Sequence, residues 1–89
     1  MAKMIYKYKL NQEHTDIDMP IGAIILAAQS QRNDICLWAL VDETAHKEKR
    51  FFVIYGTGHL LVNNPGRYIG TVQVHEGMLV WHVFEVNSI

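Results

Sequence analysis

Cysteine is almost absent from the sequence: Cys36 is the only one among 89 residues, so no disulfide can form within the chain. Small exported domains usually rely on several disulfides, because a small core stabilises a fold only weakly. Lysines interrupt the apolar residues near the start, and no apolar run approaches the roughly 20 residues that a membrane helix needs. We therefore expect a cytoplasmic protein without a signal peptide or a membrane anchor.

A surplus of positive charge is absent as well. Eight Lys and Arg residues stand against nine Asp and Glu residues, which gives a formal net charge of -1. Proteins that bind DNA or RNA without sequence preference depend on a basic excess, because they displace counterions from the phosphate backbone. General nucleic-acid binding is therefore not expected.

Apolar residues, by contrast, are abundant and make up 49% of the chain. We expect a single domain over residues 1–89, because a chain of this length rarely holds two cores. A domain of this size buries only about 60% of the surface that its unfolded chain exposes. Some apolar surface is then left for a partner, so we expect a homo-oligomer.

Short stretches alternate apolar and polar residues, which is typical of β-strands. The alternation predicts strands over residues 4–10 and 15–19, the second of them a short edge strand that ends at Pro20. Residues 42–50 are charged on every side and predict a solvated loop. Residues 50–55, rich in aromatic and β-branched side chains, predict the next strand, which stops at the glycines that follow it.

Two apolar stretches, residues 23–31 and 35–41, predict a hairpin. Asn33-Asp34 suits its tight turn, because both residue types adopt positive φ at little cost. With that turn, Trp38 lies opposite Gln29.

A second hairpin is predicted from residues 67–74 and 79–86 around Glu76-Gly77. A two-residue turn pairs Val72 with Trp81 and gives one wholly apolar face, whereas a bulged three-residue loop would offset this register by one position. The other face is mixed and carries Ile69, Thr71, Gln73 and His75 beside Met78, Val80, His82 and Phe84.

These segments amount to about six short strands with no amphipathic helix between them. Such a pattern is typical of an all-β fold, here a single small antiparallel barrel or sandwich. Trp38 and Trp81 each sit in an apolar run, so we expect both to pack in the core.

Six runs of residues support a family resemblance, in order and at regular spacing. They are Ile5-Tyr6-Lys7-Tyr8, Met19-Pro20 with Gly22-Ala23 and Ile25-Leu26, Cys36-Leu37-Trp38-Ala39-Leu40-Val41-Asp42, Tyr55-Gly56-Thr57-Gly58-His59, Tyr68-Ile69-Gly70-Thr71, and Leu79-Val80-Trp81-His82-Val83-Phe84-Glu85. Nearly the whole chain resembles the short proteins of tailed bacteriophages and prophages that are grouped as a domain of unknown function. The resemblance implies an accessory protein that acts in the cytoplasm of the infected bacterial host, and it brings no assigned chemistry.

The stretch Tyr55, Gly56, Thr57, Gly58, His59 is the most site-like part of the sequence. Two nearby glycines allow backbone N–H groups to converge on an anion, with a hydroxyl and an imidazole beside them. The stretch lacks the Lys-Ser/Thr of a phosphate-binding P-loop, and a turn at the end of a strand explains the same residues. Both interpretations stay open.

Three further residues are candidates for the same ligand. Arg67 and Tyr68 begin the last hairpin, where a guanidinium could pair with phosphate and a phenol ring could stack on a base. Arg50 is a similar candidate. Ordinary surface ion pairs are the alternative for both arginines.

Metal binding and catalysis find little support in the sequence. The five histidines lack the spacing of a zinc motif, and His75 and His82 lie about 13 Å apart at about 3.3 Å per residue, too far to share one ion. Cys36 sits inside an apolar strand, and the serines lie in no nucleophile elbow. We therefore expect no metal, no cofactor and no enzymatic activity.

Three functions fit these features. The first is a non-catalytic anti-defence protein that binds and sequesters a nucleotide immune signal, a phosphate-bearing small molecule. The second is an inhibitor that contacts a host defence protein directly through an exposed strand edge or the mixed hairpin face. The third is a minor structural protein of the phage particle.

Overall fold

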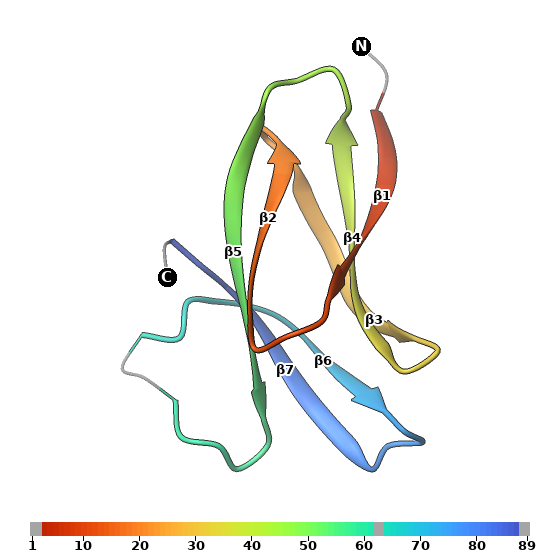
Figure 1. Cartoon of the computed structure of the whole chain (residues 1–89), viewed down its shortest axis with the longest axis vertical. Coiled ribbons are helices and arrows are strands. Elements are labelled where there is room, and N and C mark those ends of the chain that lie inside the picture. Colours follow the sequence, from red (N-terminus) through yellow and green to blue (C-terminus); the bar gives the residue numbers. More distant parts are fainter. Residues whose placement is uncertain (1–2, 62–63, 88–89) are drawn as a thin grey trace.

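A computed structural model describes residues 3–61 and 64–87 of the chain, and these residues form strands and connections without any helix (Figure 1). The all-β prediction is therefore confirmed, with seven strands rather than about six. Within the described ranges, no helix is long and apolar enough to cross a membrane. The strands are β1 (Lys3–Leu10), β2 (His14–Pro20), β3 (Ile24–Gln31), β4 (Asp34–Asp42), β5 (Lys47–Gly56), β6 (Arg67–Val74) and β7 (Leu79–Val86).

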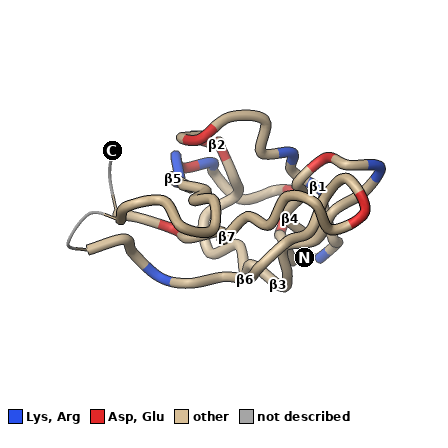
Figure 2. The backbone as a smooth tube through the Cα atoms, turned by 90° about the horizontal axis from the view of Figure 1, so that it is seen from below, with Lys and Arg blue, Asp and Glu red and all other residues tan. Residues whose placement is uncertain are grey.

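The strands form two separate antiparallel sheets, so the fold is a two-sheet arrangement rather than a closed barrel. One sheet has the order β1-β4-β3 and the other has the order β2-β5-β7-β6. Edge strands β3 and β6 pack against each other, and a Cβ added to Gly70 would lie 3.6 Å from that of Ala28. Figure 2 shows the seven strands following one another around the molecule, from β1 through β3 and β6 to β2.

The core lies between the two sheets. Strand β4 supplies alternate side chains, among them the fully buried Leu37 and Ala39. The facing sheet supplies Phe52 from β5 and Val83 from β7, which are also fully buried. Alternate residues of a strand point to opposite faces, so Leu37 and Phe52 face this core, whereas Cys36 and Val53 are buried on the outer faces of their sheets.

Trp38 corrects one prediction about this core. It lies between Leu37 and Ala39 in β4, so its side chain points to the outer face of the sheet. There it is half-buried, with Lys7 and Ala27 as its partners on the neighbouring strands. Only Trp81 packs against the core, so the prediction that both tryptophans do is wrong for Trp38.

The turn between β3 and β4 also differs from the prediction. Arg32 and Asn33, rather than Asn33-Asp34, occupy it, with φ values of 51° and 68°. The pairing therefore moves by two positions, and Trp38 lies opposite Ala27 instead of Gln29. Asn33 also accepts a hydrogen bond of 2.7 Å from the backbone N–H of His75, which ties this turn to the one between β6 and β7.

The loop predicted over residues 42–50 is shorter than expected, because β5 begins at Lys47. Its charged beginning pairs with β2, where Lys49 lies opposite Asp18. The Lys49 ammonium approaches Asp16 at 3.7 Å and Asp18 at 3.5 Å, so opposite charges face each other along this part of the strand pair. The same pairing leaves β2 at the edge of its sheet, as predicted.

The register predicted for the last hairpin is confirmed, with Val72 opposite Trp81. Its turn is longer than two residues: residues 75–78 form it, and His75 and Glu76 both adopt positive φ. The register of β6 against β7 shifts by one residue at Ile69, where a bulge places Tyr68 opposite Phe84. The stretch Asn63-Asn64-Pro65-Gly66 before this hairpin consists of residue types that end strands, and β6 begins directly after it; Asn63 itself lies outside the described residues.

Candidate functional site

A cavity of about 220 Å³ lies on the outer face of the four-stranded sheet, where β5 ends. Three parts of the chain surround it: the end of β5 with the turn that follows, the bulged start of β6, and the middle of β7. Its lining residues are Tyr55, Gly56, Thr57, Gly58, His59, Leu61, Tyr68, His82 and Phe84. The cavity is open to solvent on one side, and its wall is mostly apolar.

Aromatic rings form the largest part of this wall. Phe84 packs edge-on against Tyr55, with ring centroids 5.7 Å apart, and edge-on against Tyr68, at 5.6 Å. Such arrangements match the charge distribution of aromatic rings and hold them in fixed orientations. Tyr68 nevertheless keeps 56% of its surface exposed, so one side of its ring remains open to a ligand.

A chain of hydrogen bonds forms the polar part of the site. The two ring nitrogens of His82 each meet a hydroxyl: Nε2 lies 2.8 Å from Thr57 Oγ1, and Nδ1 lies 3.0 Å from Thr71 Oγ1. Thr71 in turn lies 2.6 Å from the hydroxyl of Tyr68. Because hydroxyls both donate and accept, this chain is satisfied with either neutral tautomer of the imidazole.

The turn after β5 is shaped by a close approach between Gly56 and His59. A Cβ at Gly56 would lie only 2.7 Å from the imidazole of His59, so a larger residue would displace that ring. The Gly56 N–H donates to His59 Nδ1 at 3.3 Å, and the ring packs edge-on against Trp81. Gly58 has a φ of +87°, which favours glycine.

The amides of this turn are mostly engaged within the protein. Besides Gly56, Thr57 donates its N–H to Val80 at 3.2 Å, and His59 donates to Gly56 at 3.1 Å. An anion site of the kind that the glycines predict would need these N–H groups to be released. The turn therefore offers an anion the Gly58 amide at most, in the arrangement that the structure shows.

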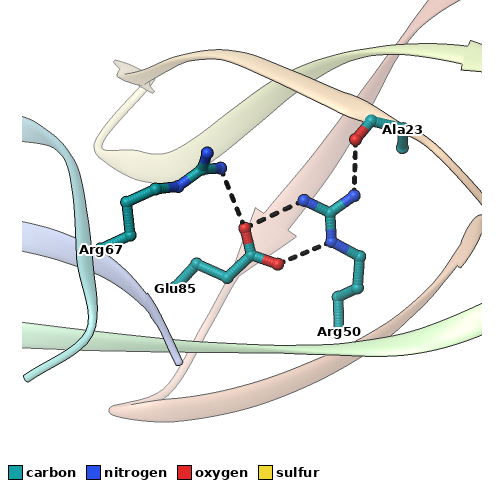
Figure 3. Close-up of polar contacts among 4 residues, drawn as sticks. All are labelled: Ala23, Arg50, Arg67 and Glu85. Atoms are coloured by element: carbon teal, nitrogen blue, oxygen red, sulfur yellow. Dashed lines mark hydrogen bonds and ion pairs between the residues drawn. The ribbon is translucent and has the colours of Figure 1, made fainter. Parts of the chain in front are cut away.

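Two arginines from the same group of candidates lie elsewhere. Glu85 follows Phe84 in β7, so its side chain points to the opposite face of the sheet from the cavity. Arg50 contacts this carboxylate through two nitrogens, at 2.6 and 2.9 Å, and donates to the carbonyl of Ala23 at 2.6 Å (Figure 3). Arg67 reaches the same carboxylate at 3.2 Å.

This ion pair is held firmly because it is partly buried. The side chains of Arg50 and Glu85 are only 15% and 17% exposed, whereas that of Arg67 is 68% exposed. The hydrogen bonds that Arg50 donates to the Glu85 carboxylate raise the pKa of Arg50 above its ordinary value. Arg50 therefore serves the junction of the two sheets and lies outside the cavity wall.

The structure thus brings six of the eight predicted site residues together and separates two. Tyr55, Gly56, Thr57, Gly58, His59 and Tyr68 line one cavity. Arg50 and Arg67 bind Glu85 instead.

Leu61, His82 and Phe84 line the cavity too, although they were not among the predicted site residues. The mixed face of the last hairpin already carried His82 and Phe84, so its alternation was the signal that could have found them. Within the described residues, no three His, Cys, Asp or Glu side chains lie close enough together to hold a metal ion.

Comparisons with known proteins give one match. The family model described as Domain of unknown function (DUF7352) matches residues 1–88, which include both sheets and every residue of the cavity wall. No curated protein and no solved structure matches the chain.

Proposed function

We propose, from the premise that this chain belongs to the family described as Domain of unknown function (DUF7352), that it is a non-catalytic binding protein for a planar aromatic ligand of the nucleobase type. One observation carries the proposal: three aromatic rings and the hydrogen-bonding side chains of Thr57 and His82 surround the same open cavity of about 220 Å³. Cavities with mostly apolar walls and a few fixed polar groups are the usual form of a small-molecule site.

The aromatic wall supports a flat ligand. Tyr55, Phe84 and Tyr68 hold one another edge-on, and the exposed side of Tyr68 is available for stacking. Stacking of a base on an aromatic side chain contributes about 1–3 kcal/mol. This contribution does not depend strongly on which base is bound, because every base has a π face.

The polar wall supports recognition of a base edge. Thr57 and His82 line the cavity, and the Tyr68 hydroxyl continues their chain of hydrogen bonds. Each hydroxyl in this chain can donate or accept a hydrogen bond, so when one of them reverses its role the others reverse theirs as well. Both nitrogens of His82 are engaged in the chain, so the imidazole serves to orient hydroxyls rather than to abstract a proton from the ligand.

A phosphate on the ligand would contribute less than the base. Arg67 neighbours Tyr68 in β6 and is largely exposed, but it is bound to Glu85. It would have to exchange that carboxylate for the phosphate, and the gain is then the difference between two ion pairs. The ligand is therefore held chiefly through its base.

The biological role that we propose is sequestration of a nucleotide immune signal in the infected bacterial host. Its support is the resemblance to short phage and prophage proteins, together with a cavity whose wall suits the base of a nucleotide. Sequestration needs binding alone, and a site that holds the base by stacking and hydrogen bonds is sufficient for it.

Thermal unfolding with and without ligands tests the proposal. We expect adenosine, guanosine and their monophosphates or cyclic dinucleotides to raise the melting temperature, and ribose 5-phosphate to leave it unchanged. A ligand at about 100 times its dissociation constant stabilises the folded state by about 2.7 kcal/mol. No shift with any base-containing ligand at millimolar concentration would contradict the proposal.

Two substitutions at one position separate the ring from the hydroxyl. Tyr68→Ala removes both and should abolish the shift, whereas Tyr68→Phe keeps the stacking surface and should weaken binding by about tenfold, the equivalent of one hydrogen bond. Tyr68 is more than half exposed, so both variants should fold. Equal binding by the wild type and Tyr68→Ala would show that ligands bind outside the cavity.

A second candidate function, contact with a host defence enzyme, is favoured by the outer face of the three-stranded sheet. Ile5 and Ile24 flank Leu40 there in one cross-strand row, and they are 61% and 52% exposed. Rows of exposed apolar side chains are typical of protein contacts. Purified defence enzymes should lose activity with the wild type and keep it with the Ile5→Ser/Ile24→Ser variant; inhibition by both would remove this candidate.

A further inference from the structure

The two sheets have four edge strands, and two of them cover each other. Strands β3 and β6 pack together, and each carries a bulge, at Leu26 and Ile69 respectively. Strands β1 and β2 are the other two edges, and neither has a second strand partner within the described residues. Unpaired edges present backbone donors and acceptors to any strand that fits them, so these two edges are the places where another chain can add.

Each of these edges is protected against a copy of itself. Strand β1 carries Lys3, Lys7 and Lys9 on its outer face, and strand β2 carries Asp16 and Asp18 on its outer face. An antiparallel pair of two β1 strands places lysine opposite lysine in every register that keeps the faces aligned and overlaps the strands by more than three residues. Two β2 strands place aspartate opposite aspartate in the same way, and like charges in opposite positions are destabilising.

The two edges are complementary to each other. An antiparallel pair of β1 with β2 places Lys7 opposite Asp18 and Lys9 opposite Asp16 on the outer face. On the inner face of the same pair, Tyr8 lies opposite Ile17, and both side chains are partly buried against the core. The exposed fractions of Lys9, Asp16 and Asp18 are 54%, 55% and 62%, so these charges are accessible to a partner.

The pairing does not form within one chain. Strands β1 and β2 meet at their short connection and run apart from there, because β1 is bonded to β4 and β2 is bonded to β5 in the other sheet (Figure 1). They are the first and last strands of the series around the molecule in Figure 2. The series of strands is open between β1 and β2. One molecule therefore presents the free edges of these two strands on the two sides of that opening.

We propose that two copies of the chain form a symmetric dimer in which β1 of each copy pairs with β2 of the other. In a two-fold dimer, a residue that contacts a second residue across the interface is contacted by that residue's counterpart in return. Both strand pairs then form at once, and both copies lose their unpaired edges. A second copy is the occupant because each edge carries the charge pattern and the apolar alternation that the other requires.

Charge exchange across the interface tests the dimer. The variant Lys7→Glu/Lys9→Glu places acidic residues opposite Asp16 and Asp18, and the variant Asp16→Lys/Asp18→Lys places lysines opposite Lys7 and Lys9. We expect the wild type to show twice its chain mass of 10.2 kDa in native mass spectrometry and light scattering, and each variant to show the single mass. An equimolar mixture of the two variants should restore the doubled mass, because both strand pairs regain opposite charges.

Control variants that change the charge in the same direction should leave the dimer intact. Arg32→Glu and Glu76→Lys alter exposed turn residues away from β1 and β2. Thermal unfolding of every variant separates loss of the dimer from loss of the fold. A wild type of single mass at 100 µM, a mixture that stays at single mass, or assemblies larger than two copies would each overturn the proposal.

Discussion

Two networks of charged side chains differ in what surrounds them. Arg50, Glu85 and Arg67 form one network between the sheets, and its central carboxylate is 17% exposed. Lys49, Asp16 and Asp18 form the other on the surface of β2 and β5, where every side chain is more than half exposed. Ion pairs in water contribute little, whereas removing one partner of a buried pair leaves a charge without compensation. The first network should therefore hold the fold together, and the second should be free to meet a partner.

Glu85→Gln should have the largest effect on this contrast. It keeps the shape of the side chain but leaves the Arg50 guanidinium partly buried without an anion, and we expect a loss of about 3 kcal/mol in the free energy of unfolding. Urea denaturation followed by tryptophan fluorescence measures it. A loss below 1 kcal/mol would mean that the Arg50–Glu85 pair contributes as little to the free energy of unfolding as the surface network does.

Arg67→Met tests the exposed arm of the same network. Arg67 is 68% exposed and makes one contact of 3.2 Å with Glu85. In the variant, Glu85 keeps both of its contacts with Arg50. We expect a loss of about 0.5 kcal/mol by the same denaturation measurement, because exposed ion pairs are screened by water. A loss equal to that of Glu85→Gln would mean that Arg67, rather than Arg50, compensates the carboxylate.

Lys49→Met should have a smaller effect still. Its contacts with Asp16 and Asp18 are 3.7 and 3.5 Å long and lie at the surface. We expect a change within about 0.3 kcal/mol at low salt, which disappears at 1 M salt because the Debye length then falls to about 3 Å. Persistence of the effect at high salt would contradict the electrostatic interpretation of the surface network.

Thr44→Val extends the comparison to Asp42, a carboxylate that has no ion pair among the described residues. The hydroxyl and backbone N–H of Thr44 donate to Asp42 at 2.6 and 3.0 Å, and these bonds lower the pKa of Asp42 below its ordinary value. A depressed pKa in the folded state favours folding above the unfolded pKa, and this contribution is lost as the pH falls through the folded value. Carbon-detected NMR titration should show the pKa of Asp42 rising in Thr44→Val; an unchanged pKa would assign the shift to another cause.

The sequence predicted the strands well because alternation is a local property. It predicted the faces of β4 less well, since Cys36, Trp38 and Leu40 on one face are as apolar as Leu37 and Ala39 on the other. Period two shows which side chains share a face, but the packing of the second sheet decides which face is covered. That is the reason why Trp38 was expected in the core.

The site was predicted in part for a related reason. Tyr55–His59 is one short continuous stretch at the end of β5 and in the turn after it, so its residues stay close together in any fold. The positions of the Arg50 and Arg67 side chains depend on Glu85, which binds both of them and lies 35 and 18 residues away in the chain. Only the pairing of β5, β6 and β7 brings these three residues together, and alternation within single strands does not reveal which strands pair.

The bulge at Ile69 couples the register of β6 to the chemistry of the cavity. It lets Ile69 pack against the core while its neighbour Tyr68 joins Phe84 and His82 on the outer face. If β6 paired with β7 without this bulge, strict alternation would put Ile69 on the outer face opposite Phe84 and turn Tyr68 toward the core, so the cavity would lose its phenol ring. Ligand preference in this fold can therefore diverge through the way one sheet edge pairs, without any substitution in the cavity wall.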